Sequence, residues 1–379
     1  MPEVLMGVGC AGLKESGDPD ILVIRLPDSA VSSFLFTTNS FKSASVLYSL
    51  ENLKKGSRIK AFVVNSGNAN CGTGSEGIKH ASMMARAVAD NLGIREEEVL
   101  VFSTGVIGQP LPVEKVLSGI NEACSYLDRI NLEVASWVIS TTDRFPKVDR
   151  WTGGNLQVYG FAKGAGMIHP SMATMLAFVF TNARLEPQEL YEMHKSVNKR
   201  TFNSITVDGC TSTNDSFGLI ALGEVLAEKD TVRRGIEEVS LTLAKKIVKD
   251  GEGATRVIAV TVLRASSEEK ARAISKAVAT SLLVKTAIYG RDPNWGRIAG
   301  AVGSTDYEVD QESMRIYLGN ILLYDGGLKN YEEEKARSYI ETSKEVRIVI
   351  DLGEGSGMWT YYSSDLGYEY IRINSEYRT

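Results

Sequence analysis

One stretch near the middle of the chain combines a cation, a loose backbone and a hydroxyl group that could act as a nucleophile. Residues 163–178 read Lys-Gly-Ala-Gly-Met-Ile-His-Pro-Ser-Met-Ala-Thr-Met-Leu-Ala-Phe. A threonine inside a chain has no base of its own, whereas a threonine at a new amino terminus carries an amine about one hydrogen bond from its hydroxyl. With an α-amino pKa of about 7.7–8.0, part of that amine is neutral near pH 7 and can take the hydroxyl proton. We therefore predict that Thr174 becomes a nucleophile when the chain is cut between Ala173 and Thr174.

The residues around this expected cut suit a strained backbone. Gly164, Ala165, Gly166 and Ala173 are small, and small residues reach conformations that bulkier ones avoid. Strain in one peptide helps a neighbouring hydroxyl attack its carbonyl carbon. The apolar run 175–180 is typical of a buried strand, which would hold the new terminus in place. A threonine before an apolar run is more often a simple strand-edge residue, so other parts of the sequence must agree.

Acyl transfer also needs donors for the oxyanion that forms at the attacked carbonyl. Residues Ser103-Thr104-Gly105 follow the strand-like run 99–102. A glycine after a strand can turn its backbone N–H inward, and the Thr104 hydroxyl could add a second donor. A plain strand-to-loop turn explains the same residues, and composition alone favours that simpler interpretation.

The elements that would position these residues follow a mixed α/β pattern. Short apolar strands alternate with helical segments in both halves of the chain, and no proline-rich or serine-rich linker separates the halves. Strands are predicted at 21–24, 61–64, 177–180, 256–263, 315–317, 346–351 and 359–362, and helices at 77–91, 112–127, 187–198, 231–248 and 268–282.

Composition argues against several classes of protein. The chain has 379 residues, a net charge of -5 and no polybasic run, which disfavours nucleic-acid binding. Its four cysteines lack CxxC spacing and have only three histidines beside them, so no metal site is predicted. The oxygen-rich segment 208–215 fits no EF-hand and favours hydrogen-bonded turns. No apolar run is long enough to span a membrane, and the start lacks a signal-peptide pattern, so a cytoplasmic protein is expected.

The sequence resembles one family along nearly its whole length. The stretch 163–176 resembles the processing site of the ornithine acetyltransferases, also called bifunctional glutamate N-acetyltransferases, of the arginine pathway. The likeness continues, in order, in 65–74, 103–108, 141–147, 204–215, 250–255, 284–298 and 374–379.

The resemblance implies a fold, a processing step and a reaction. It implies a sandwich of two sheets covered by helices, similar to N-terminal-nucleophile hydrolases but with its own topology. The self-cleavage before Thr174 would give a first chain of residues 1–173 and a second of residues 174–379, as parts of one folded unit, with two copies of each in a heterotetramer. The expected reaction moves acetyl from N2-acetylornithine to glutamate by double displacement, through an acetyl group on Thr174, with no bound cofactor.

The resemblance also implies roles for individual residues at the positions that match the family motifs. Thr104 and Gly105 match the residues that form the oxyanion hole in the family, which reverses the preference for a plain turn. Chemistry makes Lys163 the partner of the substrate carboxylate and Glu252 the partner of the ornithine ammonium. The substrate contacts implied by the match are Thr141, Lys163, Thr174, Glu252, Asn374 and Thr379.

Several alternatives stay open at this point. Water in place of glutamate would make the chain an amidohydrolase or aminopeptidase, and an uncut chain could be a binding protein for acetylated amino acids. Acetyl-coenzyme A could be a second acetyl donor, since the family contains both kinds of member. Glutamate would bring a carboxylate toward Glu252, so either its side chain points elsewhere or a cation such as Lys285 or Arg297 intervenes.

Overall fold

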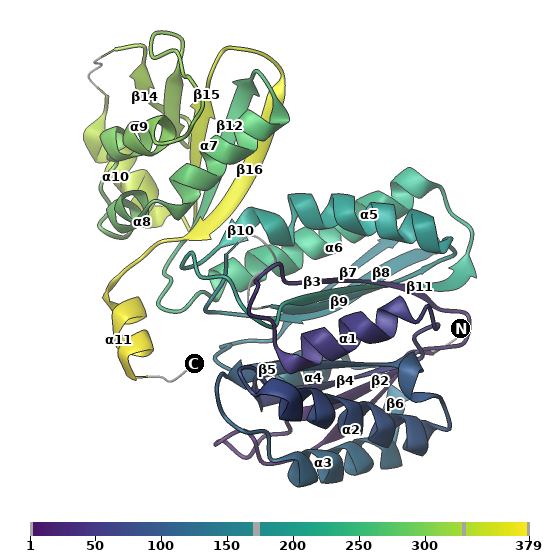
Figure 1. The fold of residues 1–379 in the computed structure, drawn as a ribbon. Helices are drawn as coiled ribbons and strands as arrows, with labels where there is room; N and C mark the ends of the chain where they lie inside the picture. Colours follow the sequence, from purple (N-terminus) through teal and green to yellow (C-terminus); the bar gives the residue numbers. More distant parts are fainter. Residues whose placement is uncertain (1–2, 170–174, 328–330, 377–379) are drawn as a thin grey trace. The chain divides into compact units, whose positions relative to one another are not determined.

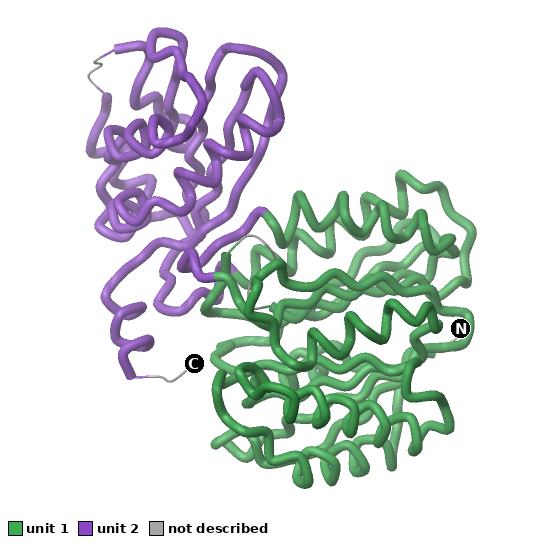
Figure 2. Tube along the Cα trace, in the orientation of Figure 1, with its two compact units in different colours: residues 1–203, 211–247, 378–379 green, residues 204–210, 248–377 purple. Residues whose placement is uncertain are grey.

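The computed structural model describes residues 3–169, 175–327 and 331–376. The chain forms two compact units, coloured separately in Figure 2. Unit 1 comprises residues 1–203, 211–247 and 378–379, and unit 2 comprises residues 204–210 and 248–377. The expected cut therefore falls inside unit 1 and does not coincide with the boundary between units.

Unit 1 contains two five-stranded sheets. The first has the order β5-β4-β2-β1-β6, and the second has the order β3-β11-β9-β8-β7. In the first sheet β4 and β5 are parallel, and in the second β9 and β11 are parallel. The strands of the first sheet are β1 (Leu5–Gly9), β2 (Ile21–Arg25), β4 (Ala61–Asn68), β5 (Val99–Val106) and β6 (Asp128–Arg129), and those of the second are β3 (Val31–Phe36), β7 (Lys147–Gly153), β8 (Leu156–Lys163), β9 (Leu176–Ala183) and β11 (Ser216–Val225).

Aromatic side chains from both sheets pack together between them. Because side chains alternate across a strand, Phe62 and Phe102 of the first sheet point inward to Phe178 of the second. The rings of Phe62 and Phe178 stack with centroids 4.5 Å apart. This shared core makes unit 1 the predicted two-sheet sandwich.

Helices cover the outer faces of the sandwich, as Figure 1 shows. The opposite faces of β2, β4 and β5 bury Val23, Val63 and Val101 against Met84 and Ile120 of two covering helices. The second sheet is covered by two longer helices, and a short one contacts strands of both sheets. The helices of unit 1 are α1 (Ala44–Lys54), α2 (Gly74–Leu92), α3 (Val113–Ser125), α4 (Leu132–Ile139), α5 (Pro187–Arg200) and most of α6 (Lys229–Lys249).

Unit 2 is built on a third sheet, which the sequence did not separate from the sandwich. Its order is β10-β16-β12-β15-β13-β14, and α7 packs on β12 and β16. The strands are β10 (Ile205–Thr206), β12 (Val257–Ala265), β13 (Arg315–Leu318), β14 (Ile321–Asp325), β15 (Glu345–Asp351) and β16 (Gly357–Ser364); the helices are α7 (Glu268–Thr280), α8 (Leu282–Tyr289), α9 (Trp295–Gly303), α10 (Glu333–Thr342) and α11 (Tyr368–Glu376).

The predicted elements lie where expected. The predicted helix 268–282 is α7, and a helix that was not predicted, α8, follows it at once, because the Ser281 side chain accepts a hydrogen bond from the N–H of Val284 and caps a new helix. Among the described residues, no helix combines the length and apolar character needed to cross a membrane.

Candidate active site

The site is built where strands from the two stacked sheets end. Thr104 lies near the end of β5 in the first sheet, and Lys163 is the last residue of β8 in the second. Both side chains are buried, with 2% of each residue exposed. In the register of β8 and β9, Lys163 pairs with Leu176, so the loop between these strands contains the predicted cut.

The Lys163 ammonium bridges residues that are far apart in sequence. Its Nζ donates to the Thr104 hydroxyl at 3.0 Å and to the Thr141 hydroxyl at 2.9 Å. A hydroxyl that accepts a hydrogen bond can still donate its own proton, and the accepted bond polarises that O–H. The structure therefore brings three predicted site residues together, with two hydroxyl donors beside one cation.

A buried carboxylate supports this group. Asp143 Oδ1 accepts from Lys147 Nζ at 2.5 Å and from the backbone N–H of Gly164 at 2.7 Å. Its Oδ2 accepts from the N–H of Thr141 at 3.2 Å. Burial acts to raise the pKa of Asp143, but the ammonium groups of Lys147 and Lys163 and the Gly164 N–H lower it below its usual value. Asp143 is therefore ionised, and it fixes the backbone of Thr141 and of Gly164, the residue after Lys163.

Gly105 has a backbone that other residues rarely adopt. Its φ is +132°, and a Cβ placed there would lie 2.2 Å from the carbonyl carbon of Gly67 on β4. A side chain at this position would clash with backbone, so only glycine fits. Gly105 thus lies within β5, and not after the strand as the sequence indicated.

The segment after the predicted nucleophile is held by β11. The N–H of Met175 donates to Asp215 Oδ1 at 2.9 Å, and the N–H of Ser216 donates to the Met175 carbonyl at 3.1 Å. Asp215 is fully buried. In the sequence Asp215 stood in a family motif and a segment of turns, without a role of its own; the signal that could have found it is an acidic residue directly before the apolar run of β11.

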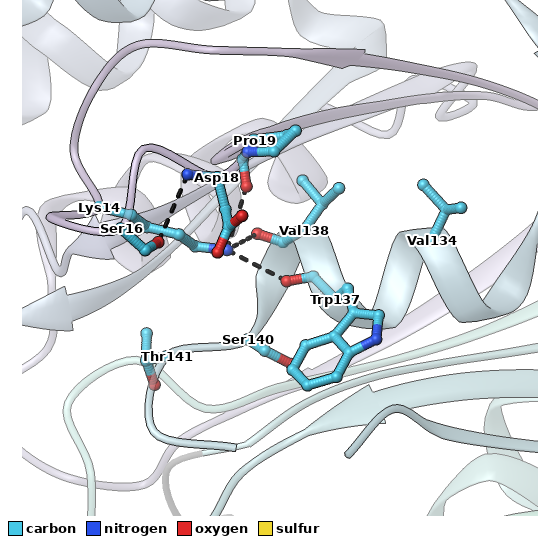
Figure 3. Close-up of a pocket in the computed structure, with 9 residues that line it drawn as sticks. All are labelled: Lys14, Ser16, Asp18, Pro19, Val134, Trp137, Val138, Ser140 and Thr141. Atoms are coloured by element: carbon cyan, nitrogen blue, oxygen red, sulfur yellow. Dashed lines mark hydrogen bonds between the residues drawn. The ribbon is translucent and has the colours of Figure 1, made fainter. Parts of the chain in front are cut away.

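A cavity of about 460 Å³ borders the Thr141 side of the site, as shown in Figure 3. Lys14 crosses it and donates to the carbonyl oxygens of Pro19, Trp137 and Val138 at 3.0, 3.1 and 2.9 Å. Trp137 and Val138 lie in α4, and Pro19 lies in the loop after β1, so the Lys14 ammonium joins α4 to this loop. The cavity is lined by Lys14, Ser16, Asp18, Pro19, Val134, Trp137, Val138, Ser140 and Thr141.

Two further predicted residues meet in unit 2. Asn374 Nδ2, on α11, donates to Glu252 Oε2 at 3.0 Å. Glu252 follows α6 in the glycine-flanked turn and is 8% exposed. A carboxylate offers about four acceptor sites, so a contact with an amide does not by itself prevent one with an ammonium group.

The remaining predicted residues lie outside the described part of the chain. These are Ala173 and Thr174 at the expected cut and Thr379 at the end. Asp143 and Lys147 stood in the family motif 141–147 without a predicted role. Their signal was two opposite charges four residues apart in a short polar segment.

Comparison with known proteins gives consistent matches. A profile of the ArgJ family matches residues 5–379. The chain is 60% identical over 379 residues to the arginine biosynthesis bifunctional protein ArgJ of Aquifex aeolicus, with all of both chains covered. It is 42% identical over 380 residues to the glutamate N-acetyltransferase of Methanopyrus kandleri, with 97% of each covered. A solved ArgJ structure from Bacillus halodurans matches with a TM-score of 0.52 and 38% identity, over 54% of this chain and all of that chain.

Proposed function

Because this chain belongs to the ArgJ family, we propose that it transfers an acetyl group from N2-acetylornithine to glutamate in arginine biosynthesis, with Thr174 as the nucleophile. The observation that carries the proposal is the buried contact of Lys163 with the Thr104 hydroxyl. Lys163 is the last residue of β8 and pairs with Leu176 of β9. This contact gathers a cation and a hydroxyl donor at the loop that contains the expected cut.

Self-cleavage supplies the catalytic base. The Thr174 hydroxyl attacks the Ala173 carbonyl carbon, the peptide C–N bond breaks, and the nitrogen becomes the free amine of Thr174. Water then hydrolyses the resulting ester and leaves a carboxylate on Ala173. The same hydroxyl and the new amine form the nucleophile and base of the mature enzyme.

Acetyl transfer proceeds in two displacements. The Thr174 hydroxyl attacks the acetyl carbonyl, its proton passes through the amine to the departing ornithine nitrogen, and acetyl-threonine remains. The α-amine of glutamate then attacks this ester and leaves as N-acetylglutamate. The Thr104 hydroxyl and the Gly105 N–H stabilise the oxyanion of each tetrahedral intermediate.

Charged groups select the substrates. Lys163, held between Thr104 and Thr141, attracts the substrate α-carboxylate, and Glu252 with Asn374 receives the ornithine ammonium. Thr379 completes the set by the family match. The relative from Aquifex aeolicus carries the name bifunctional, so we include acetyl-coenzyme A as a second donor.

The two fragments would stay joined after cleavage. Strands β8 and β9 lie on either side of the cut and pair along six residues each, from Val158 with Thr181 to Lys163 with Leu176. This pairing supports two fragments that remain one folded unit; the heterotetramer and the cytoplasmic location belong to the same proposal.

Electrophoresis and activity measurements test this function. Purified protein should give two bands under denaturing conditions, and Thr174→Ala should give one full-length band without activity. Full activity in Thr174→Ala would refute the nucleophile. The product distinguishes the alternatives, because N-acetylglutamate identifies a transferase whereas acetate identifies a hydrolase. Release of free thiol from acetyl-coenzyme A in the presence of glutamate tests the second donor.

A further inference from the structure

Asp215 is a buried carboxyl group that the mechanism above does not use. It is the residue before β11, the strand between β3 and β9 in the second sheet, and no part of it is exposed. Its own carbonyl accepts the N–H of Thr37, so its backbone is fixed to the end of β3. Asp215 is thus held where β11 begins, beside the end of β3.

The Asp215 side chain contacts the peptide group that follows the predicted nucleophile. Its Oδ1 accepts the N–H of Met175 at 2.9 Å, and this nitrogen is covalently joined to the carbonyl carbon of Thr174. The next residue, Ser216, donates to the Met175 carbonyl at 3.1 Å. Asp215 and Ser216, at the start of β11, therefore fix both peptide groups of Met175, one through a side chain and one through the backbone.

The carboxyl group at this position lies wholly out of water. Its second oxygen, Oδ2, is buried as well. Burial raises the pKa of Asp215 well above its usual value, although the Met175 N–H, the Lys163 ammonium and the Ser212 side chain act against this. Without the carboxyl acceptor the buried Met175 N–H would be left unpaired, at a cost of about 1–3 kcal/mol. Such a group is retained where it holds something that matters.

We propose that Asp215 is a positioning residue, which fixes the Thr174–Met175 peptide through Oδ1 and thereby orients Thr174 for self-cleavage and acetyl transfer. The inference rests on the proposed role of Thr174. It adds a second anchor to the one from β8, where Lys163 pairs with Leu176. Met175 and Leu176, the two residues after the reacting one, are then held by the strands on both sides of β9.

Substitution at this position separates the acceptor oxygen from the charge. Asp215→Asn keeps an oxygen that can accept the Met175 N–H and is neutral, so it should process itself and retain kcat within about threefold. Asp215→Ala removes the acceptor, and a nucleophile displaced by about 1 Å loses on the order of 10²-fold in rate. We expect that loss in the rate of processing and in kcat, with the KM for N2-acetylornithine nearly unchanged.

The matched control lies at the far end of β9, the strand that follows Met175. Asn182, near the end of β9, accepts the N–H of Gln157 at 2.8 Å. Asn182→Ala therefore removes a comparable contact between a side chain and the backbone, far along β9 from Thr174. It should lower the melting temperature about as much as Asp215→Ala and leave processing and kcat unchanged.

Three outcomes would overturn the proposal. One is normal processing and kcat in folded Asp215→Ala, and another is an equal loss of kcat in Asn182→Ala. The third is that Asp215→Asn fails as completely as Asp215→Ala, which would mean that the acid group itself is needed. If Asp215→Ala does not fold, Asp215→Ser is used with the same measurements. Failure of the nucleophile is seen separately, as activity in Thr174→Ala.

Discussion

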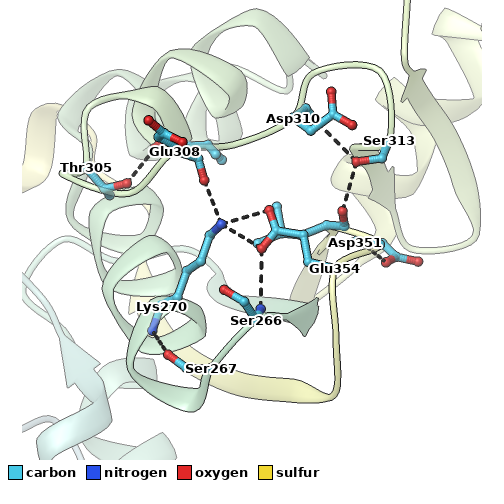
Figure 4. A network of polar contacts seen from close by, with 12 residues as sticks. Ser266, Ser267, Lys270, Thr305, Glu308, Asp310, Ser313, Asp351 and Glu354 are labelled. Atoms are coloured by element: carbon cyan, nitrogen blue, oxygen red, sulfur yellow. Dashed lines mark hydrogen bonds and ion pairs between the residues drawn. The ribbon is translucent and has the colours of Figure 1, made fainter.

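Two polar clusters, one in each unit, use similar groups in different surroundings. In unit 1, Asp143 and Lys147 form an ion pair of 2.5 Å with both side chains fully buried. In unit 2, Lys270 and Glu354 form a pair of 2.6 Å with side chains 8% and 21% exposed, at the centre of the network in Figure 4. Both pairs are short, but only the first is shut away from water.

The surroundings show what each cluster is for. Lys270 donates to both oxygens of Glu354 and to the Glu308 carbonyl, so it joins α7 to two loops. This contact holds loops in place. Because the Glu354 side chain is 21% exposed and water reaches it, the pair contributes less stability than a fully buried one. The buried pair in unit 1 carries a desolvation penalty of several kcal/mol, which an apolar replacement would avoid. Its position beside Lys163 and Thr141 indicates a chemical use.

The largest expected difference is in stability. Lys147→Met leaves Asp143 charged and buried, which should lower the free energy of unfolding by about 3–5 kcal/mol. Lys270→Met should lower it by about 1 kcal/mol, because Glu354 can be hydrated. Urea unfolding of both variants at pH 7 measures the difference. Equal losses would show that burial does not distinguish the two pairs.

A smaller effect is expected on catalysis at the Lys163 contact. Thr104→Val removes one oxyanion donor and should lower kcat about 10²–10³-fold with little change in melting temperature. The control is Thr360→Val in unit 2, which breaks the hydroxyl contact with Thr261 at 3.0 Å in the third sheet. Steady-state kinetics should show wild-type kcat for Thr360→Val. An unchanged kcat in Thr104→Val would remove this residue from the oxyanion hole.

The substrate-binding pair in unit 2 should respond through KM. Glu252→Gln keeps an oxygen for Asn374 but loses the negative charge, so the KM for N2-acetylornithine should rise about tenfold or more. The KM for glutamate should stay or fall, because a repelling carboxylate is gone. Glu369→Gln, an exposed carboxylate paired with Arg372 on α11, is the control. A parallel rise of both KM values would contradict the assigned charge role.

The smallest effect is expected from pH. The folded pKa of Asp143 lies below the ordinary value of 3.8, so its stabilising contribution is present above that value and lost as pH falls through the folded pKa. The stability difference between wild type and Asp143→Asn should therefore be constant from pH 8 to about pH 5 and shrink below about pH 4. Unfolding midpoints across this range measure it. A difference that changes near pH 7 would mean that Asp143 titrates there.

Much of the fold followed from the sequence. The apolar run 346–351 matches β15 to within one residue, whereas the run 61–64 covers only the first four residues of β4, whose second half is polar. Helix α8 was missed because the serine that caps it is a local signal directly after another helix. The separate third sheet was missed because strand pairing depends on partners distant in the chain.

The candidate site was predictable in part. The motifs named Thr104, Thr141 and Lys163, and the structure brings them within hydrogen-bond distance. No role was predicted for Asp215, because its contact with the Met175 N–H joins residues directly before two neighbouring strands that are 40 positions apart in the sequence. The residues at the predicted cut lie outside the described part of the chain, so the cleavage remains a prediction.

The sequence by itself determined which groups are present: Thr174 before an apolar strand, Lys163 eleven residues before that threonine, and family motifs along the whole chain. Family membership was predicted from those motifs and is confirmed by the match over residues 5–379. Only the tertiary structure decided which groups meet. Thr104 and Lys163 are 59 residues apart and end strands in different sheets. Their contact exists because the two sheets stack face to face on a shared aromatic core, which no local pattern specifies.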